Sequence, residues 1–313
     1  MLSILIPIYN CDTRQLVQTL HQQALSTGIE YEILLLDDAS DNENVCHINQ
    51  QLKNLPSVTL FELPTTAGRA VARNFLAGQA KYKHLLFLDC DTEVVDDNYI
   101  NRYIPYCNKK DIVVCGGIAY KQEQPSQNAK LRWIYGKKYE EKMSKANAKN
   151  ETKRAANEIT SFSSFNFLID KDLFWSIRFN ELLKNYGHED TLLGIELQKR
   201  NYHITHIDNP LYHIGIDDTD TYLNKTEKGV ENLKILLNQY PDRDSLIKYI
   251  RLLKFYHALE KTHSVGFVRV LYRFTRSLML KNLRSKHPNL TIFNLYKLGY
   301  LCYLMSAKKN FAL

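Results

Sequence analysis

The chain has 313 residues, enough to bury a sizeable core as one large domain or as a domain with an appendage. Hydrophobic residues make up 44% of the chain and charged residues 24%, which excludes a disordered protein. The net charge of +7 is unevenly distributed, because residues 245–313 hold 13 Lys and Arg against one acid, Glu260, and so carry +12. Residues 1–244 are therefore net acidic, at −5.

The first part of the chain alternates short apolar runs with helix-forming segments. Apolar runs bounded by turn residues predict strands at 2–8, 31–36, 57–63, 84–88 and 112–119. Helical length and periodicity predict helices at 13–26, 42–55 and 68–80. This order indicates an α/β fold with an open, mostly parallel sheet flanked by helices. Ligands of such sheets bind beyond the carboxyl ends of the strands.

The rest of the chain begins with a polar and charged insertion, residues 121–158, which contains Trp133 and Tyr135. The insertion is either a solvated surface loop and helix or a lid over a bound ligand. A strand is predicted at 162–169, and helices are predicted at 246–259 and 265–283. We therefore expect two domains, an α/β domain at 1–240 and a basic, aromatic-rich helical C-terminal region at 241–313.

The first acidic motif, Asp89-Cys90-Asp91, directly follows the apolar run 85–88. Residues i and i+2 of an extended strand lie on one face, so both carboxylates project the same way. Such acids are hard oxygen ligands for Mg²⁺ or Mn²⁺, which typically joins protein carboxylates to a substrate diphosphate. The motif alone is a weak signal, because acids also follow strands as turn and helix-capping residues.

A second acidic pair, Glu189-Asp190, opens a predicted helix that continues through Leu197. Capping and the helix dipole favour acids in a first turn without any catalytic role. Alternatively, one of these carboxylates is a general base within hydrogen-bond reach of a substrate hydroxyl. In that interpretation Asp190 is the base, and Glu189 orients the second substrate.

Two further segments carry residues suited to binding. His213 lies in a strand-like run, residues 210–215, where it is either a buried core residue or a metal ligand. An imidazole beside carboxylates would favour Mn²⁺ over Mg²⁺. Gly68 opens a helix with Arg69 and Arg73 one turn apart, which either face the phosphates or base of a nucleotide or are solvated. This segment is neither a Walker loop nor a dinucleotide fingerprint, which counts against P-loop hydrolysis and hydride transfer.

In this order, the motifs resemble those of the family 2 glycosyltransferases, an inverting family with the GT-A fold. Residues 4–10 (ILIPIYN) look like its first strand, residues 36–41 (LDDASD) like its base-binding turn, and residues 68–74 (GRAVARN) like its Gly…Ala-Arg-Asn segment. Asp89-Cys90-Asp91 matches its Asp-x-Asp motif, Glu189-Asp190 is similar to its Glu-Asp pair, and His213 lies where many members have a histidine metal ligand. The resemblance covers residues 1–215, and one departure is Ala39, where members commonly have glycine.

The resemblance implies a role for each residue. The nucleobase would be surrounded by Pro7, Tyr9 and Asp38, and donor binding would also involve Gly68, Arg69, Arg73 and Asp89. The ion, Mn²⁺ or Mg²⁺ with Mn²⁺ favoured, would be bound by Asp91 and His213 with Asp89 nearby, and Asp190 would be the base. Metal and arginines would neutralise the charge of the leaving diphosphate. No covalent sugar-enzyme intermediate is required, so one base suffices.

The implied reaction moves a hexosyl or N-acetylhexosaminyl group, with inversion, from a nucleoside diphosphate sugar to a glycan or lipid-linked glycan acceptor. A uridine nucleotide is typical of the family, and synthesis of cell-surface polysaccharide or lipopolysaccharide is the expected setting.

The basic C-terminal region suggests a further partner. Basic and apolar residues are interleaved in residues 267–274 (FVRVLYRF), as in an amphipathic helix at an anionic membrane surface. Packing on the catalytic domain and a dimer contact are the alternatives, so oligomeric state stays open. The start of the chain lacks the basic n-region and cleavage site of a secretory signal, and the apolar stretch 291–307 is interrupted by Lys297. With six cysteines and no Cys-x-x-Cys pair, we expect a cytoplasmic protein, peripheral on the inner face of the membrane.

Two other functions would account for parts of the sequence. A nucleotidyltransferase on a related sheet would also bring a metal to a diphosphate, but it leaves Glu189, Asp190 and His213 unexplained. A non-enzymatic nucleic-acid-binding protein would use the basic tail. No nucleic-acid module is recognised and residues 1–244 are net acidic, so nucleic acid is not an expected partner.

Overall fold

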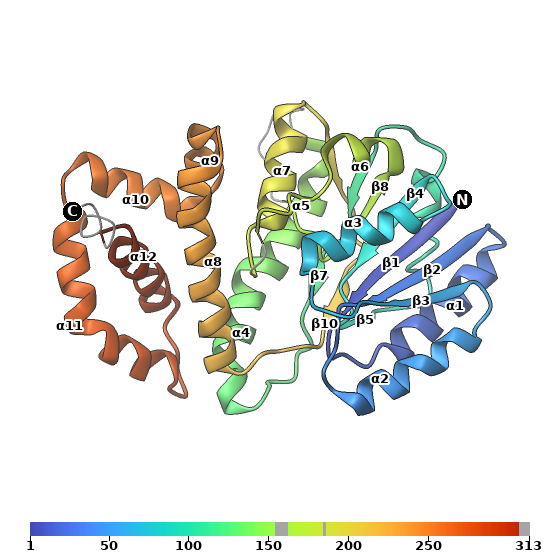
Figure 1. Ribbon diagram of the computed structural model, residues 1–313, viewed down its shortest axis with the longest axis horizontal. Helices are drawn as coiled ribbons and strands as arrows, with labels where there is room; N and C mark the ends of the chain where they lie inside the picture. The colour runs from blue at the N-terminus through green and yellow to red at the C-terminus, as the bar shows by residue number, and fades with distance from the viewer. Residues whose placement is uncertain (154–161, 184–185, 307–313) are drawn as a thin grey trace. The chain divides into compact units, whose positions relative to one another are not determined.

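The computed structural model describes residues 1–153, 162–183 and 186–306, and it contains a seven-stranded sheet (Figure 1). The strand order is β3-β2-β1-β4-β8-β6-β9. Neighbouring strands are parallel except that β8 runs antiparallel to β4 and β6. The strands are β1 (Leu2–Ile8), β2 (Tyr31–Asp37), β3 (Val58–Glu62), β4 (His84–Leu88), β6 (Val113–Cys115), β8 (Asn166–Asp170) and β9 (Ile204–His206).

Helices cover both faces of this sheet, and the alternation of β1 shows how. Ile4 and Ile6 join the apolar cluster that contains Leu16 of α1, whereas Leu5 joins the cluster that contains Leu76 of α3. All five side chains are almost completely buried. The helices of this part are α1 (Arg14–Thr27), α2 (Glu43–Gln50), α3 (Arg69–Gln79), α5 (Lys142–Asn150), α6 (Lys171–Ile177) and α7 (Glu189–Lys199).

A second, three-stranded sheet has the order β5-β10-β7. Its strands are β5 (Thr92–Val94), β7 (Ile118–Ala119) and β10 (Leu211–His213). β10 is antiparallel to β5 and parallel to β7, and His213 is paired with Thr92. Because Thr92 follows the Asp-x-Asp motif directly, this small sheet brings His213 next to the end of β4.

Short helical turns connect these elements. They are η1 (Gln51–Asn54), η2 (Ile104–Tyr106), η3 (Gln127–Ala129), the π-helical η4 (Gly136–Glu141) and η5 (Glu151–Lys153).

The chain divides into two compact units. The α/β unit comprises Met1–Gln122, Lys137–Lys184 and Glu189–Gly215 and contains both sheets. The helical unit comprises Glu123–Gly136, Asn185–His188 and Ile216–Leu313. Its helices are α4 (Lys130–Tyr135), α8 (Thr219–Gln239), α9 (Arg243–Tyr249), α10 (Arg251–Lys261), α11 (Val265–Leu283) and α12 (Leu290–Ser306).

Tyrosine hydroxyls join the long helices of the helical unit. Tyr296 and Tyr300 of α12 donate hydrogen bonds to Glu227 and Glu231 of α8, the latter at 2.7 Å. The ring of Tyr272 on α11 lies 5.7 Å from that of Tyr296. These contacts fix α11 and α12 on α8.

The structure confirms the predicted α/β class, with a mostly parallel sheet and C-terminal helices. Three predicted elements are wrong in detail. Residues 112–119 form two strands, separated by Gly116 and Gly117, and residues 246–259 form two helices, α9 and α10, that break at Ile250. Residues 42–55 form α2 followed by η1. The insertion 121–158 is largely helical up to Lys153, and its last residues lie outside the described part. None of the described helices is long and apolar enough to cross a membrane.

Candidate active site

Three of the predicted donor residues, Tyr9, Asp38 and Asp89, directly follow three neighbouring parallel strands, β1, β2 and β4, whereas Gly68, Arg69 and Arg73 come after β3. Parallel strands end at the same edge of a sheet, so the turns after Ile8, Asp37 and Leu88 lie side by side. Tyr9, which follows β1, is 51% exposed and available to a ligand. Pro7 lies within β1 and is partly buried.

Asp38, directly after β2, organises the loop that leads into α3. Its two carboxylate oxygens accept hydrogen bonds from the backbone amides of Ala67, at 2.6 Å, and Gly68, at 2.9 Å. Gly68 has a φ of 93°, a conformation that L side chains rarely adopt. Asp38 thereby fixes the start of α3 and the position of Arg69, whose side chain is exposed.

Asn10, directly after Tyr9 at this edge, has a structural role that the motifs alone do not reveal. Its side-chain oxygen accepts hydrogen bonds from the backbone amides of Asp41 and Asn42, both at 3.1 Å, and its amide nitrogen donates to the Asp41 carboxylate at 2.7 Å. Asn10 and Ala39 both have positive φ, 49° and 58°. Asparagine adopts positive φ more readily than most residues do, and an asparagine directly after a strand is the one sequence feature that could have indicated this turn. Hydrogen bonds of Asn10 thus hold the turn after β2 against the end of β1.

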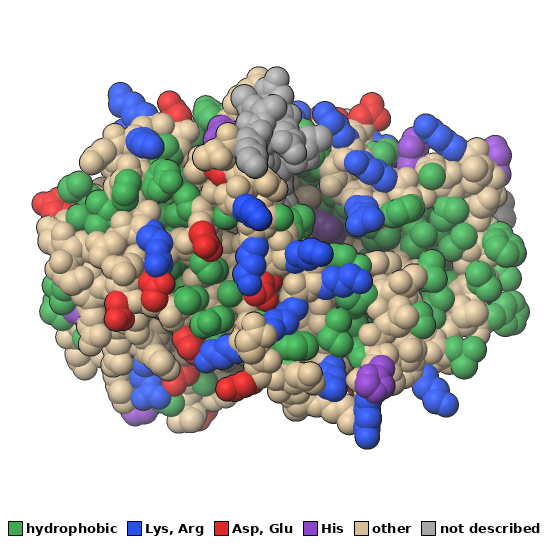
Figure 2. Space-filling model, turned by 180° about the vertical axis from the view of Figure 1, so that it is seen from behind, with side chains coloured by type: hydrophobic (Ala, Val, Ile, Leu, Met, Phe, Trp, Pro, Cys, Tyr) green, Lys and Arg blue, Asp and Glu red, His purple; other side chains and the backbone are tan. Residues whose placement is uncertain are grey.

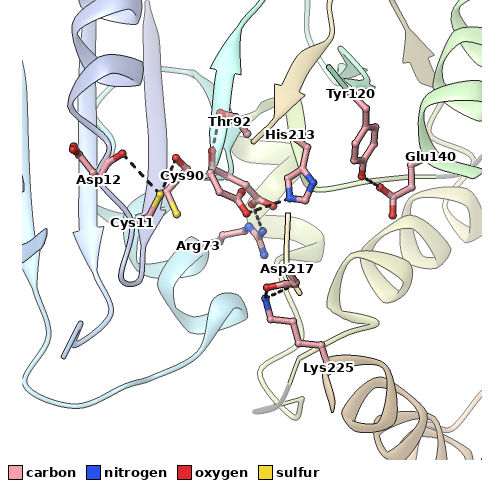
Figure 3. A network of polar contacts seen from close by, with 12 residues as sticks. Cys11, Asp12, Arg73, Cys90, Thr92, Tyr120, Glu140, His213, Asp217 and Lys225 are labelled. Atoms are coloured by element: carbon pink, nitrogen blue, oxygen red, sulfur yellow. Dashed lines mark hydrogen bonds and ion pairs between the residues drawn. The ribbon is translucent and has the colours of Figure 1, made fainter. Parts of the chain in front are cut away.

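Asp91 and His213 lie together. His213 Nε2 is 3.2 Å from Asp91 Oδ2, and the imidazole side chain is 9% exposed. The rings of Tyr120 and Phe165 lie edge-on to the imidazole, and Figure 3 shows His213 with Tyr120 nearby. Burial by itself would raise the pKa of Asp91. The hydrogen bond and charge of His213, together with the charge of Arg69, outweigh this, so the pKa lies below the usual value of the carboxyl. Asp91 is therefore a carboxylate at neutral pH.

Gly215 is required for this arrangement. The backbone amides of Ile214 and Gly215 donate to the Asp91 carbonyl, at 3.0 and 3.4 Å. A Cβ on Gly215 would come within 2.4 Å of Asp91 Oδ2 and 2.6 Å of its Cβ. Any side chain there would displace the carboxylate, yet a glycine two residues after a histidine is too common to reveal this in the sequence.

The Asp91 and His213 donors fit a divalent cation as two of its ligands. Carboxylate oxygen and imidazole nitrogen are both ligand types for Mn²⁺. Among the described residues, His213 Nδ1 has no hydrogen-bond partner, and Nε2 is in contact with Asp91. No cluster of three or more His, Cys, Asp or Glu suited to a metal occurs among the described residues. The other coordination positions would fall to substrate oxygens and water, as in sites that bind a metal-diphosphate complex.

Arg73 joins the two acidic motifs inside the protein. Its side chain is only 2% exposed, with Nη2 2.7 Å from Asp89 Oδ1 and Nη1 3.6 Å from Glu189 Oε1. The guanidinium also lies 5.3 Å from the centre of the Phe179 ring. The neighbouring Asn74 exchanges hydrogen bonds with the backbone of Phe179, which holds that ring in place. The sequence suggested that Arg73 faces a ligand, whereas its burial favours a positioning role.

Glu189 and Asp190 differ in their surroundings although they are adjacent. Glu189 is 6% exposed and is paired with Arg73. Asp190 is partly buried and accepts hydrogen bonds from the backbone amide and hydroxyl of Thr191, at 2.6 and 3.3 Å. Burial and the charge of Glu189 raise the pKa of Asp190 to about 6. Asp190 is thus a carboxylate near neutral pH, but a more basic one than an exposed aspartate.

Comparison with known proteins identifies the family. A family model described as "Glycosyl transferase family 2" matches residues 3–178, more than half of the chain. The chain belongs to glycosyl transferase family 2. The resemblance seen in the sequence is therefore confirmed, and the match favours glycosyl transfer over nucleotidyl transfer.

Two curated relatives of this family 2 chain are glycosyltransferases. An "Uncharacterized glycosyltransferase" of Haemophilus influenzae is 31% identical over 99 residues, which cover 31% of this chain and 38% of that protein. "Uncharacterized glycosyltransferase YibD" of Escherichia coli is 34% identical over 100 residues, which cover 31% of this chain and 28% of that protein. The matched segments thus span well under two thirds of the length of these relatives.

A solved structure with the same fold is the mannosyltransferase PcManGT from Pyrobaculum calidifontis, in complex with GDP-Man and Mn²⁺. It aligns with a TM-score of 0.57 and 13% identity, over 99% of this chain and 88% of that one. At this identity the likeness shows the GT-A fold alone.

In this family 2 chain, hydrogen bonds and ion pairs join predicted site residues into three groups. Asp38 is joined to Gly68, Asp91 to His213, and Arg73 to both Asp89 and Glu189. All of these residues belong to the α/β unit. The charge of Arg69 also acts on Asp91, and the charges of Glu189 and Arg73 act on Asp190.

A contact inside the helical unit fixes the loop that precedes the acidic pair. The buried Asn232 of α8 donates hydrogen bonds to the carbonyls of Tyr186, at 3.2 Å, and Gly187, at 2.9 Å. Gly187 and His188 both have positive φ, 104° and 73°, so the chain turns sharply there. Asn232 therefore holds the residues that lead directly into Glu189. The sequence carried no signal for it, because an asparagine in a helix is ordinary.

Proposed function

We propose that this glycosyltransferase moves a hexosyl or N-acetylhexosaminyl group from a nucleoside diphosphate sugar to a hydroxyl of a glycan or lipid-linked glycan, with inversion. A UDP-sugar is the preferred donor, and synthesis of cell-surface polysaccharide or lipopolysaccharide is the proposed setting, on the cytoplasmic side of the membrane. The observation that carries the proposal is the Arg73 bridge, which joins the Asp-x-Asp motif to the Glu-Asp pair through Asp89 and Glu189.

Donor binding is proposed for the edge of the sheet formed after β1, β2 and β4. The exposed ring of Tyr9, beside Pro7, offers a flat apolar surface to a nucleobase. Asp38 holds Gly68 and so presents Arg69, which as an exposed cation suits the diphosphate. Mn²⁺, or Mg²⁺, would be held by Asp91 and His213 near Asp89, and when bound it supplies Lewis-acid stabilisation of the leaving diphosphate.

Asp190 is proposed as the general base. Its pKa, raised to about 6, still lies below neutral pH, so the group is mostly ionised there, and it is a better proton acceptor than an ordinary carboxylate. It takes the proton from the acceptor hydroxyl as the hydroxyl oxygen attacks the anomeric carbon opposite the leaving diphosphate. Glu189 is buried against Arg73, so we assign it to holding the start of α7 rather than to direct contact with the acceptor. A single displacement of this kind needs one base and no covalent intermediate.

The test is a screen of nucleotide sugars for hydrolysis or transfer in the presence of Mn²⁺, with Asp91→Ala and Asp190→Asn as site variants. Asp244→Asn is the matched control, because Asp244 is an exposed carboxylate in the first turn of α9. We expect loss of turnover in both site variants and full turnover in the control. Activity that survives both site changes would remove the assignment, and NMR of the anomeric proton of the product would decide whether the configuration is inverted.

A further inference from the structure

The outer face of α11 carries a row of large apolar side chains. Phe267 is 72% exposed, Phe274 82% and Leu278 68%, and Val270 and Leu271 between them are nearly half exposed. Their spacing of three, four and seven residues places all five on one side of the helix. Figure 2 shows hydrophobic side chains gathered at the right of the view, over the helical unit, with Lys and Arg side chains above and below them.

The inner face of α11 is already occupied. Tyr272 and Leu283 are buried, and the ring of Tyr272 packs so closely on α12 that a Cβ on Gly299 would come within 2.5 Å of it. Arg276 and Arg284 are paired with Glu227 and Asp220 of α8, at 3.4 and 2.7 Å. The exposed row is therefore the face opposite the packing of the helical unit. Single exposed apolar residues are ordinary on a protein surface, but a contiguous row of this size marks an interaction surface.

The charge around this face selects the partner. Arg273 and Lys281 are exposed on α11, and residues 245–313 carry +12 in all. A second copy of the chain would place two positively charged surfaces against each other, and their repulsion disfavours a dimer through α11. A surface that is apolar inside and anionic outside satisfies both features, and long Arg and Lys side chains reach its phosphates while their stems stay in the apolar zone.

We propose that α11 lies along the surface of a membrane that contains anionic lipid. Phe267, Phe274 and Leu278 enter the apolar zone, and Arg273 and Lys281 contact the phosphates. The helix lies in the interface rather than across the bilayer, since no described helix is long and apolar enough to span one. Attachment of this kind would keep the enzyme beside a lipid-linked acceptor, a consequence that rests on the proposed function.

The experiment is sedimentation of the full chain with vesicles, measured without any turnover. Vesicles of phosphatidylcholine mixed with phosphatidylglycerol are compared with vesicles of phosphatidylcholine alone. The test variant combines Phe267→Ser, Phe274→Ser and Leu278→Ser, and a second variant combines Arg273→Glu and Lys281→Glu. Leu25→Ser is the matched control, because Leu25 is 58% exposed on α1 of the α/β unit. All changed side chains are exposed, and circular dichroism verifies that each variant is folded.

We expect tight binding to the anionic vesicles only, weakened about a hundredfold in the serine variant and at least about thirtyfold in the glutamate variant. The Leu25 control should bind as the wild type does. Equal binding of wild type and serine variant, or equal binding to both kinds of vesicle, would overturn the proposal. A wild type that is dimeric by light scattering and becomes monomeric in the serine variant would assign the face to a second copy instead. Because donor hydrolysis is assayed separately, failure of vesicle binding is distinguishable from failure of the proposed function.

Discussion

Replacing Arg73 by methionine tests whether this buried guanidinium holds the two acidic motifs in place. Arg73 is 2% exposed and lies 2.7 Å from Asp89 and 3.6 Å from Glu189. Methionine keeps an apolar side chain in the cavity but removes the positive charge between the two carboxylates. Removing one partner of a buried ion pair costs about 3–5 kcal/mol, because the remaining charge is left buried and unpaired. That is a large part of the stability of a typical protein, about 5–15 kcal/mol.

The assay is urea and thermal unfolding of the Arg73→Met variant beside a matched control, Arg102→Met. Arg102 makes a comparably short pair with Asp96, at 2.8 Å, but its side chain is 39% exposed. Solvent screens such a pair, so the control should lose less than about 1 kcal/mol. The double variant Arg73→Met with Asp89→Asn should recover part of the loss, because it removes one of the unpaired charges. The reasoning would be refuted by an Arg73→Met variant as stable as the wild type, or no less stable than the Arg102→Met control.

The same substitution has a second consequence at the proposed base. The charge of Arg73 opposes the rise in the pKa of Asp190 that burial and Glu189 cause. Without Arg73, the pKa of Asp190 should rise further, and the acid limb of the rate profile should move to higher pH. A change in stability with no shift of that limb would show that Arg73 supports the fold but does not influence the base.

Three further predictions concern single residues. Because burial and Glu189 raise the pKa of Asp190 to about 6, kcat/KM should fall about tenfold per pH unit below that value as the base is protonated; an unchanged rate down to about pH 5 would contradict this. The hydrogen bond with Cys90 lowers the pKa of Cys11, whereas burial raises that of Cys107 to about 11. Iodoacetamide should therefore label Cys11 first, and donor should slow that labelling, as followed by mass spectrometry; faster labelling of Cys107 would refute it. Ala39 has a φ of 58°, so Ala39→Gly should stabilise the protein by about 0.5–1 kcal/mol in urea unfolding, and a lower midpoint would show that the turn is unstrained.

The central strands were predictable because their signal is local. Leu2–Ile8 and His84–Leu88 have the bounds expected from the sequence, since each is an unbroken apolar run between polar residues. The direction of β8 was not predictable, because antiparallel pairing with β4 and β6 is decided by contacts distant in the chain. The division of the predicted strand at Gly116 and Gly117 was also not predictable, because it involves neighbours distant in the chain. A Cβ on Gly116, for example, would come within 2.2 Å of the Tyr103 hydroxyl.

The candidate site was predictable as a set of residues but not as a set of contacts. The order of the motifs indicated Asp91 and His213 as candidate metal ligands, and the structure adds that their side chains are in contact, at 3.2 Å. Whether an arginine on an amphipathic helix faces solvent or the interior depends on what packs against it, so the burial of Arg73 was not evident. The roles of Asn10 and Gly215 also depend on turns that meet only in the folded chain.

The Arg73 bridge changes how variants of the acidic motifs should be interpreted. Asp89 and Glu189 are 100 positions apart in the sequence, yet both carboxylates are balanced by one buried cation. Neutralising either acid leaves the positive charge of Arg73 balanced by one carboxylate instead of two, which would shift Arg73 and, with it, the other acidic motif. A loss of activity in such a variant would therefore not report on the changed residue alone. The partners of Arg73 in the bridge are Asp89 and Glu189, whereas Asp91 is paired with His213 and Asp190 accepts a hydrogen bond from Thr191. The side chains of Asp91 and Asp190 can therefore be changed without removing a partner of the bridge. Asp91 and Asp190, rather than the more deeply buried acids beside them, are therefore the residues at which loss of activity reports on chemistry.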